Sequence, residues 1–178
     1  MTTHPLSKFR FCPACGSHHF EINNQASKKC TDCGFTYYFN PRAATVALIR
    51  NGKGELLVAR RAKDPAKGTL DLPGGFVDSY ETGEEAVARE VLEETGLVTD
   101  SVRYLFSLPN IYPYSGMDIH TLDLFFECRI GNLGAVKAMD DVAALMWLAP
   151  DEIDPEQFGL QSIRKGVARY IAMLRNQE

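Results

Sequence analysis

Apolar residues between positions 44 and 61 follow the pattern of two short strands. In the segments 44–50 and 55–61 they alternate or run continuously, as in a sheet that is packed on both faces. The residues between them, Asn51-Gly-Lys-Gly, are typical of a turn, so we predict a hairpin. Further strands are predicted for 98–106, for 119–130 and around 146–148.

Alternation is longest in the segment 119–130, where two sets of side chains face opposite ways. One face carries His120, Leu122, Leu124, Phe126 and Cys128, and the other carries Thr121, Asp123, Phe125 and Glu127. We expect Cys128 to be a buried, unreactive thiol. We expect His120 to be packed or to lie at a rim, since hard cations prefer oxygen ligands.

Two segments have the spacing of amphipathic helices. The first begins with Thr82 and Glu85 in the spacing of a capping box and ends at Gly96, a residue typical of a helix C-terminus. Its predicted apolar side consists of Ala86, Val87, Val91 and Leu92. The second, 161–175, is predicted to turn inward Ile163, Val167, Tyr170, Ile171 and Leu174.

The first helix also carries three carboxylates on one face. Glu90, Glu93 and Glu94 are related as i, i+3 and i+4, so their side chains lie close together and repel one another. A hard cation such as Mg²⁺ or Mn²⁺ removes this repulsion, because it takes carboxylate oxygens as ligands. The alternative is a solvated acidic face.

A longer motif contains this helix. From Gly75 to Leu97 the chain has every fixed position of the pattern G-x5-E-x7-R-E-U-x-E-E-x-G-U, in which U is apolar. The chain therefore resembles the Nudix hydrolases. The resemblance implies an α/β fold of the α/β/α sandwich type with a mixed β-sheet. It also implies metal-dependent hydrolysis of a nucleoside diphosphate linked to another moiety.

The resemblance also implies roles for the matched residues. Glu90 and Glu94 are implied to be ligands of Mg²⁺ or Mn²⁺, and Glu93 is implied to be a further ligand or the general base. Arg89 and Glu81 are expected to pair and to orient the carboxylates.

Nudix enzymes commonly have one more acid, three residues before an aromatic residue of the last strand. Here the aromatic residue is Trp147, and the position of the acid is occupied by Ala144. Either Asp140 or Asp141 substitutes from the preceding loop, or the set of metal ligands is smaller.

Four of the five cysteines form two C-x-x-C pairs, Cys12/Cys15 and Cys30/Cys33, each followed by a glycine. This spacing predicts a zinc ribbon with closed, structural coordination by four thiolates. Disulfides are disfavoured without a secretion signal, and a redox C-x-x-C does not come as a spaced pair. His18 and His19 are expected to be exposed. We predict a ribbon domain at 1–40 and a Nudix domain at 41–178.

A zinc ribbon followed by this motif resembles the NADH pyrophosphatase branch of the Nudix hydrolases. That branch has S-Q-P-W-P-F-P-x-S about ten residues after the motif, and here the segment 107–115 reads SLPNIYPYS. Leu108, Asn110 and Ile111 replace Gln, Trp and Pro, which leaves the substrate open; the segment can also be a proline-rich rim loop without a role in specificity. The candidate substrate-binding residues are Tyr38, Leu108, Pro109, Asn110, Tyr112, Tyr114 and Ser115.

The composition narrows the classes of partner. The 178 residues are 45% hydrophobic and 24% charged, as in a globular protein, and the net charge of −4 argues against binding of duplex nucleic acid. There is no run of 18 apolar residues and no apolar segment at the N-terminus, so we expect a cytoplasmic protein without a membrane partner. The resemblance also implies a possible homodimer.

These observations leave three functions open. The first is hydrolysis of a dinucleotide such as NADH or NAD, and the second is hydrolysis of ADP-ribose or a nucleotide sugar. The third is a nucleotide-sensing or nucleic-acid-binding module in which the Nudix fold is catalytically silent.

Overall fold

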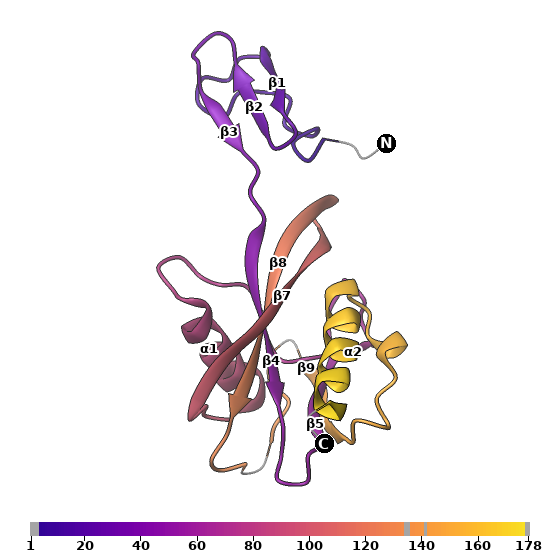
Figure 1. The fold of residues 1–178 in the computed structure, drawn as a ribbon. Coiled ribbons are helices and arrows are strands. Elements are labelled where there is room, and N and C mark those ends of the chain that lie inside the picture. Colours follow the sequence, from indigo (N-terminus) through magenta and orange to yellow (C-terminus); the bar gives the residue numbers. More distant parts are fainter. Residues whose placement is uncertain (1–3, 134–135, 141, 177–178) are drawn as a thin grey trace.

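The computed structural model describes residues 4–133, 136–140 and 142–176, which form a small β-sheet unit and a larger layered body (Figure 1). The small unit contains β1 (Phe20–Asn24), β2 (Ser27–Cys30) and β3 (Thr36–Tyr38), paired antiparallel in that order. Its apolar cluster is small and consists of Cys12, Phe20 and Cys30, with Phe9 packed against them, and Leu6 is one further buried apolar residue. A core of this size cannot hold the unit together without further support.

The body is built on two three-stranded sheets. One has the order β4 (Arg42–Ile49), β8 (Met117–Arg129), β7 (Ser101–Tyr114), and the other the order β6 (Leu70–Asp71), β5 (Leu56–Arg61), β9 (Val142–Leu148). β4 and β8 run parallel, whereas every other pair of these strands is antiparallel. The predicted mixed arrangement of strands is therefore confirmed.

Two helices cover opposite faces of the strands, so the body is the predicted α/β/α sandwich (Figure 1). On one side α1 (Gly83–Thr95) packs Val87 and Val91 against Ala47 and Ile49 of β4. On the other side α2 (Gln161–Arg175), which follows the short 3-10 helix η1 (Pro155–Gln157), covers the alternate residues of the same strand, including Val46 and Leu48. The continuous apolar run in β4 thus serves two cores.

The predicted hairpin between 44–50 and 55–61 is wrong. Both strands exist, but β4 and β5 belong to different sheets and share a single bridge, between Arg50 and Leu56. β4 instead pairs with β8 along its whole length, from Arg42–Thr121 to Ile49–Cys128. The other edge of β4 is bonded to the segment 73–77, through Thr45 N–Gly75 O, Ala47 N–Pro73 O and Val77 N–Ala43 O. Neither edge of β4 is therefore left for a ladder with β5.

The segment 107–115 is a strand up to Tyr114 and not a proline-rich rim loop. β7 continues through it, and its residues pair one by one with β8 as far as Tyr114–Met117. Pro109 and Pro113 are compatible with this pairing because β7 is the edge strand of its sheet. A proline can occupy an edge strand when its missing N–H would have faced away from the partner.

Leu92 departs from the predicted apolar side of the first helix. Ala86, Val87 and Val91 are fully buried, but 49% of Leu92 is exposed. The prediction for the second helix holds, because Ile163, Val167, Tyr170 and Ile171 are buried and Leu174 packs against the same core. None of the helices in the described part of the chain is long and apolar enough to span a membrane.

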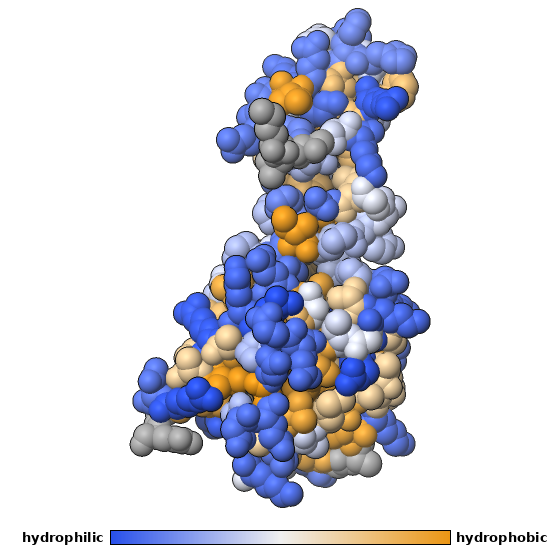
Figure 2. Space-filling model, turned by 90° about the vertical axis from the view of Figure 1, so that its right-hand side faces the viewer, coloured by the Kyte–Doolittle hydropathy of each residue, from blue (hydrophilic) through white to orange (hydrophobic). Residues whose placement is uncertain are grey.

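The small unit contacts the tip of the β7–β8 hairpin. The ammonium group of Lys8 donates to the carbonyl oxygen of Gly116, and the ring of Phe39 meets the exposed His120 edge-on, with 6.2 Å between centroids. A side view shows a narrow waist between the two parts and a mostly hydrophilic surface on the small unit (Figure 2). Cys128 lies inside the body, and its burial raises the pKa of its thiol to about 12.

Candidate active site

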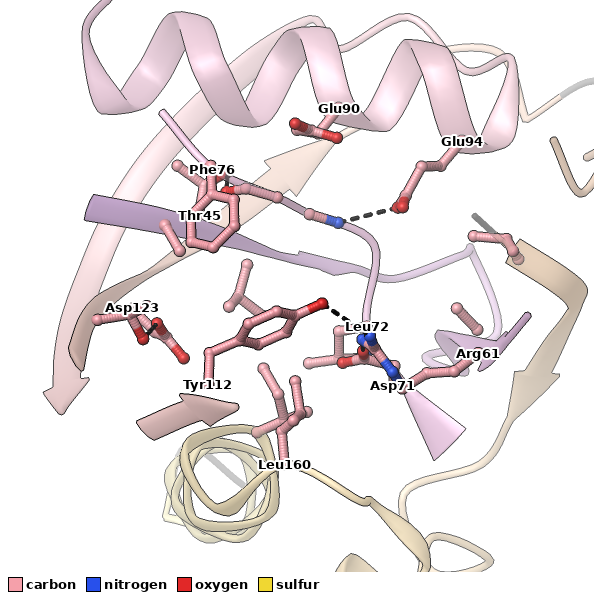
Figure 3. Close-up of a pocket in the computed structure, with 18 of the residues that line it drawn as sticks. Thr45, Arg61, Asp71, Leu72, Phe76, Glu90, Glu94, Tyr112, Asp123 and Leu160 are labelled. Carbon is pink, nitrogen blue, oxygen red and sulfur yellow. Dashed lines mark hydrogen bonds and ion pairs between the residues drawn. The ribbon is translucent and has the colours of Figure 1, made fainter. Parts of the chain in front are cut away.

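The loop before α1 runs tightly between the helix and β4. Its backbone accepts a hydrogen bond from Thr45 N to Gly75 O at 2.7 Å, and Gly74 N donates to Glu94 Oε2 at 3.0 Å (Figure 3). A side chain at Gly74 would overlap the carbonyl group of Thr45, and one at Gly75 would overlap the carboxylate of Glu90. Both glycines are therefore needed for the close approach of backbone and carboxylates.

The helix begins and ends where the sequence predicts. Thr82 is the N-cap, and it exchanges hydrogen bonds with Glu85 in a complete capping box. Gly96 ends the helix in the left-handed conformation, with φ of 72°, and its N–H donates to Leu92 O. These two ends determine which turn of the helix carries the acidic residues.

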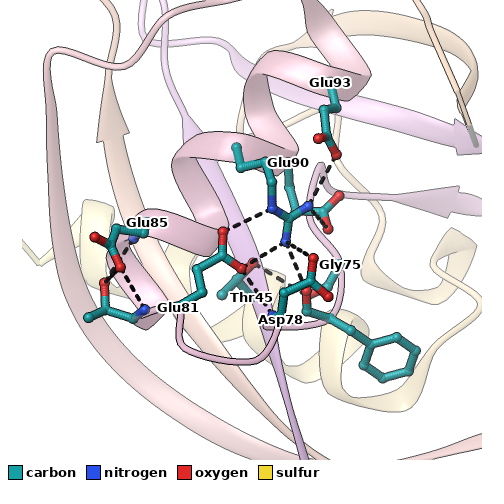
Figure 4. Close-up of polar contacts among 10 residues, drawn as sticks. Thr45, Gly75, Asp78, Glu81, Glu85, Glu90 and Glu93 are labelled. Carbon is teal, nitrogen blue, oxygen red and sulfur yellow. Dashed lines mark hydrogen bonds and ion pairs between the residues drawn. The ribbon is translucent and has the colours of Figure 1, made fainter.

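Arg89 connects the acidic residues of the motif (Figure 4). Its guanidinium group binds Glu81 through two hydrogen bonds of 2.9 and 3.0 Å, so the expected pairing of these residues is present. The same group donates to Glu90 Oε1 at 2.8 Å and to Glu93 Oε2 at 3.1 Å. It also donates to Phe76 O at 3.1 Å, which holds the loop against the helix.

This network changes the acidity of its members. The hydrogen bonds from Arg89 lower the pKa of Glu81 below its usual value. Burial raises the pKa of Glu90, and this effect outweighs the opposing influence of Arg89. The nearby Glu93 and Asp140 raise the pKa of Glu90 further, because each adds negative charge.

A cavity of about 380 Å³ extends from these carboxylates across β4 to the start of α2 (Figure 3). We call the part lined by Glu90, Glu93, Glu94 and Asp140 the acidic end. Asp140 comes from the loop before β9 and has a left-handed backbone, with φ of 49°. Asp141, the other residue considered for the additional acid, lies outside the described residues.

We call the opposite part of the cavity, next to Leu160 and Ile163, the α2 end. There Arg61 forms an ion pair with Asp71 and lies 3.4 Å from the hydroxyl group of Tyr112. Asp123 is also at the α2 end and is 4% exposed.

Burial raises the pKa of Asp71, and this effect outweighs the opposing influence of Arg61. The sequence reasoning missed both acids at the α2 end. The signal for them is a single carboxylate between two apolar residues of a strand, as in Leu70-Asp71-Leu72 and Leu122-Asp123-Leu124.

Only part of the predicted substrate-binding set lines the cavity. Asn110 and Tyr112 do so, from the face of β7 that points toward α2. Leu108 packs instead against the core on the α2 side. The remaining candidates are not among the described lining residues, and they are exposed: Tyr38 on β3, and Pro109, Tyr114 and Ser115 along the hairpin.

The four predicted zinc ligands form a separate cluster in the small unit. The Sγ atoms of Cys12, Cys15, Cys30 and Cys33 all lie within 4.8 Å of one another. Backbone N–H groups of Cys33 and Asp32 lower the pKa of the Cys30 thiol to about 7, which favours the thiolate. Four sulfurs so close together are compatible with tetrahedral zinc. His19 is exposed and pairs with Asp32 at 3.0 Å.

Several curated proteins that are similar to the chain have the same name. A protein of Vibrio cholerae named "NAD-capped RNA hydrolase NudC" is 35% identical over 114 residues, which cover 64% of this chain and 42% of that protein. A protein of the same name from Vibrio vulnificus is 29% identical over 85% of this chain and 55% of its own length. The chain thus spans about half the length of these relatives.

The fold has a counterpart among solved structures. A NUDIX hydrolase from Nitrosomonas europaea superimposes with a TM-score of 0.70 at 21% sequence identity, covering 92% of this chain and 90% of that one. The model of the NUDIX domain family matches residues 40–170, which include both ends of the cavity and most of the chain. This chain belongs to the NUDIX domain family.

Proposed function

We propose that the protein hydrolyses the diphosphate bond of a nucleoside diphosphate derivative with the help of Mg²⁺ or Mn²⁺. The observation that carries the proposal is the charge of the cavity. Its described lining includes seven carboxylic acids but only four cationic side chains, Arg42, Arg60, Arg61 and Lys63. Such a cavity repels a diphosphate unless bound cations compensate for the excess of acids.

The residues of the acidic end suit a hard divalent cation. All of their donors are carboxylate oxygens, and Gly75 leaves room for the carboxylate of Glu90. Glu90 and Glu94 are proposed as metal ligands, and Glu93 as a further ligand or the general base. Asp140 is the proposed substitute for the acid that Ala144 lacks, because it lines the same cavity. The bound metal would supply charge neutralisation on the phosphate oxygens and a more acidic water.

Arg89 and Glu81 are proposed to be positioning residues. Their paired hydrogen bonds hold the guanidinium group, which in turn holds Glu90 and Glu93 on the cavity side of α1. A side chain fixed by several bonds loses little freedom when substrate binds, and this lowers the barrier to reaction.

For the substrate, our first candidate is a dinucleotide of the NADH or NAD type. The names of the two Vibrio relatives and the partial S-x-P-x-x-x-P-x-S match at 107–115 support it. ADP-ribose or a nucleotide sugar is the second candidate, since Asn110 stands in the cavity where the branch has Trp. An RNA with a 5′-NAD cap belongs among the compounds to be tested, because it contains the same dinucleotide as the first candidate and because the two Vibrio relatives are named for it.

The decisive test compares wild type with Glu94→Gln in a panel of NADH, NAD⁺, ADP-ribose, nucleotide sugars and NAD-capped RNA. Glu94→Gln keeps the shape and a hydrogen-bond acceptor for Gly74 N but removes a ligand charge. We expect a loss of kcat/KM of about 100-fold or more with an unchanged melting temperature. Glu84→Gln, at an exposed acid of the same helix, is the matched control.

The outcomes separate the candidates. The compound with the highest kcat/KM identifies the substrate class. Near-normal turnover by Glu94→Gln would contradict the proposed metal ligands. If wild type binds these nucleotides but hydrolyses none of them, the protein is a sensing module and the proposed activity is wrong.

We further propose a structural zinc ion at the four cysteines, a division into domains at 1–40 and 41–178, and a cytoplasmic location. A homodimer is proposed from the resemblance to the NADH pyrophosphatase branch. Light scattering of the purified chain tests it, and a monomer at all concentrations would exclude it.

A further inference from the structure

Two buried carboxylates lie at the α2 end of the cavity. Asp71 and Asp123 are both buried there, at 8% and 4% exposure, and Arg61 is paired with Asp71. Electrostatic repulsion from Asp123 raises the pKa of Asp71 further, so the two carboxylates interact. None of the described residues forms an ion pair with Asp123.

Asp123 is held by two hydroxyl groups instead of a cation. Thr121 Oγ1 donates to one carboxylate oxygen at 2.6 Å, and Ser162 Oγ donates to the other at 2.5 Å. Ser162 belongs to the first turn of α2, and the positive end of a helix favours an ionised carboxylate. Asp123 is therefore oriented from both sides, and each of its two oxygens accepts one hydrogen bond.

This arrangement leaves hydrogen-bonding capacity unused. An ionised carboxylate has about four lone-pair positions, and the two hydroxyl groups occupy one on each oxygen. Burying a charge without a cation is costly unless its hydrogen bonds are completed. Asp123 lines the cavity beside Tyr112, on the opposite side from Glu90 and Glu94 (Figure 3). A ligand in the cavity can therefore donate further hydrogen bonds to this carboxylate.

We propose that Asp123 determines specificity by accepting a hydrogen bond from a donor on the nucleoside part of the substrate. This inference rests on the proposed function, in which the diphosphate lies at the acidic end. The nucleoside part of the same molecule then extends across β4 toward α2. The donors that it offers are ribose hydroxyl groups and exocyclic NH2 groups, and both suit an ionised carboxylate.

The test measures calorimetric affinity for pairs of mononucleotides that differ at one polar group, with one member of each pair lacking an OH or NH2 donor. The probes are AMP against 2′-deoxy-AMP, 3′-deoxy-AMP and inosine monophosphate, and nicotinamide mononucleotide against nicotinate mononucleotide. In wild type we expect at least one pair to differ by about 10- to 100-fold, the effect of one hydrogen bond to a charged group. The pair that differs identifies the donor.

Asp123→Asn should remove this preference, so that both members of the affected pair bind within about threefold of each other. Asp118→Asn is the matched control, because Asp118 is an exposed carboxylate on the same strand and is not among the described residues that line this cavity. Ser162→Ala, which frees one carboxylate oxygen, should weaken the preference partially and serves if Asp123→Asn does not fold.

Two results would overturn the inference. One is a wild type that does not distinguish any pair, and the other is an Asp123→Asn or Ser162→Ala variant that keeps the full preference. The proposed function fails separately, through absence of hydrolysis in wild type. In that case the calorimetric affinities for the mononucleotide pairs still show whether Asp123 binds the nucleoside.

Discussion

At the scale of single residues, Gly75 sets the position of a carboxylate in the cavity. A Cβ atom at this position would overlap the carboxylate group of Glu90, which also accepts a hydrogen bond from Arg89. The backbone of Gly75 is itself fixed by the bond from Thr45. The side chain of Glu90 must therefore move if a methyl group is added.

We predict that Gly75→Ala lowers kcat/KM by about 10- to 100-fold while the protein stays folded, because a displaced ligand misplaces the metal. Steady-state kinetics at several Mg²⁺ concentrations should show a higher metal requirement. Gly52→Ala is the control, since a Cβ there meets no atom within 4 Å. Equal activity of the two variants would show that Glu90 tolerates displacement.

At the scale of elements, Glu127 of β8 joins β7 and α2 on the face of the sheet that α2 covers, and it is not among the described residues that line the cavity. Arg103 of β7 donates to it at 2.8 Å, Tyr170 of α2 donates at 3.3 Å, and Arg50 lies 3.8 Å away. Burial raises the pKa of Glu127, but the interactions with Arg103 and Arg50 outweigh it and lower the pKa below the usual 4.5.

A carboxylate whose pKa is lowered by folding stabilises the protein above the pKa of the unfolded chain. That stabilisation disappears as the pH falls through the lower, folded pKa. We predict that Glu127→Gln reduces the free energy of unfolding by about 1–2 kcal/mol at pH 7. The difference from wild type should shrink steadily below pH 4.5.

Urea denaturation of both proteins between pH 3 and pH 7 measures this effect, with Glu84→Gln as the variant of an exposed acid. A difference that stays constant across this range would mean that Glu127 stabilises through packing rather than through charge.

At the scale of the whole molecule, the small unit depends on its cysteines far more than the body does. Two of the three buried residues in its apolar cluster are cysteines, whereas the body has two extensive cores on either side of its strands. Zinc binding in such small units contributes roughly 10–16 kcal/mol of apparent free energy. The ribbon and the body should therefore respond differently to loss of the metal.

We predict that chelation of zinc, or Cys33→Ser, unfolds the region 4–40 and leaves the body folded. Limited proteolysis should then cut the ribbon and spare a fragment that begins near Arg42. Cys128→Ala is the control, because Cys128 is a buried thiol in the body and should not affect zinc content. A protease-resistant ribbon without metal would contradict a structural zinc ion.

Local signals made much of the site predictable. The ends of α1 follow from Thr82, Glu85 and Gly96, which act on backbone groups within one turn. The shared face of Glu90, Glu93 and Glu94 follows from helix geometry alone, and all three line the cavity. The four cysteines come together because each pair spans one tight turn, and the two turns are joined through β1 and β2.

The features that the sequence did not predict depend on contacts between residues that are distant in the chain. The hairpin at Asn51 was a local inference, and it is wrong because β4 pairs with β8 on one edge and with the distant segment 73–77 on the other. Strand alternation correctly gave the two faces of β8, but it could not show that Asp123 meets Ser162, which lies 39 residues further along the chain. Only Asn110 and Tyr112 of the proposed substrate-binding residues line the cavity, since the pairing of β7 decides which of its residues face it.

The sequence by itself determined the acidic helix, the cysteine cluster and the family, because capping, helical periodicity and short spacings act between neighbours in the chain. Only the tertiary structure decided the shape of the cavity and the chemistry of its α2 end. Those features arise where α1, β4, β5, β7, β8 and α2 meet, and the burial of a carboxylate such as Asp123 depends on every one of its neighbours.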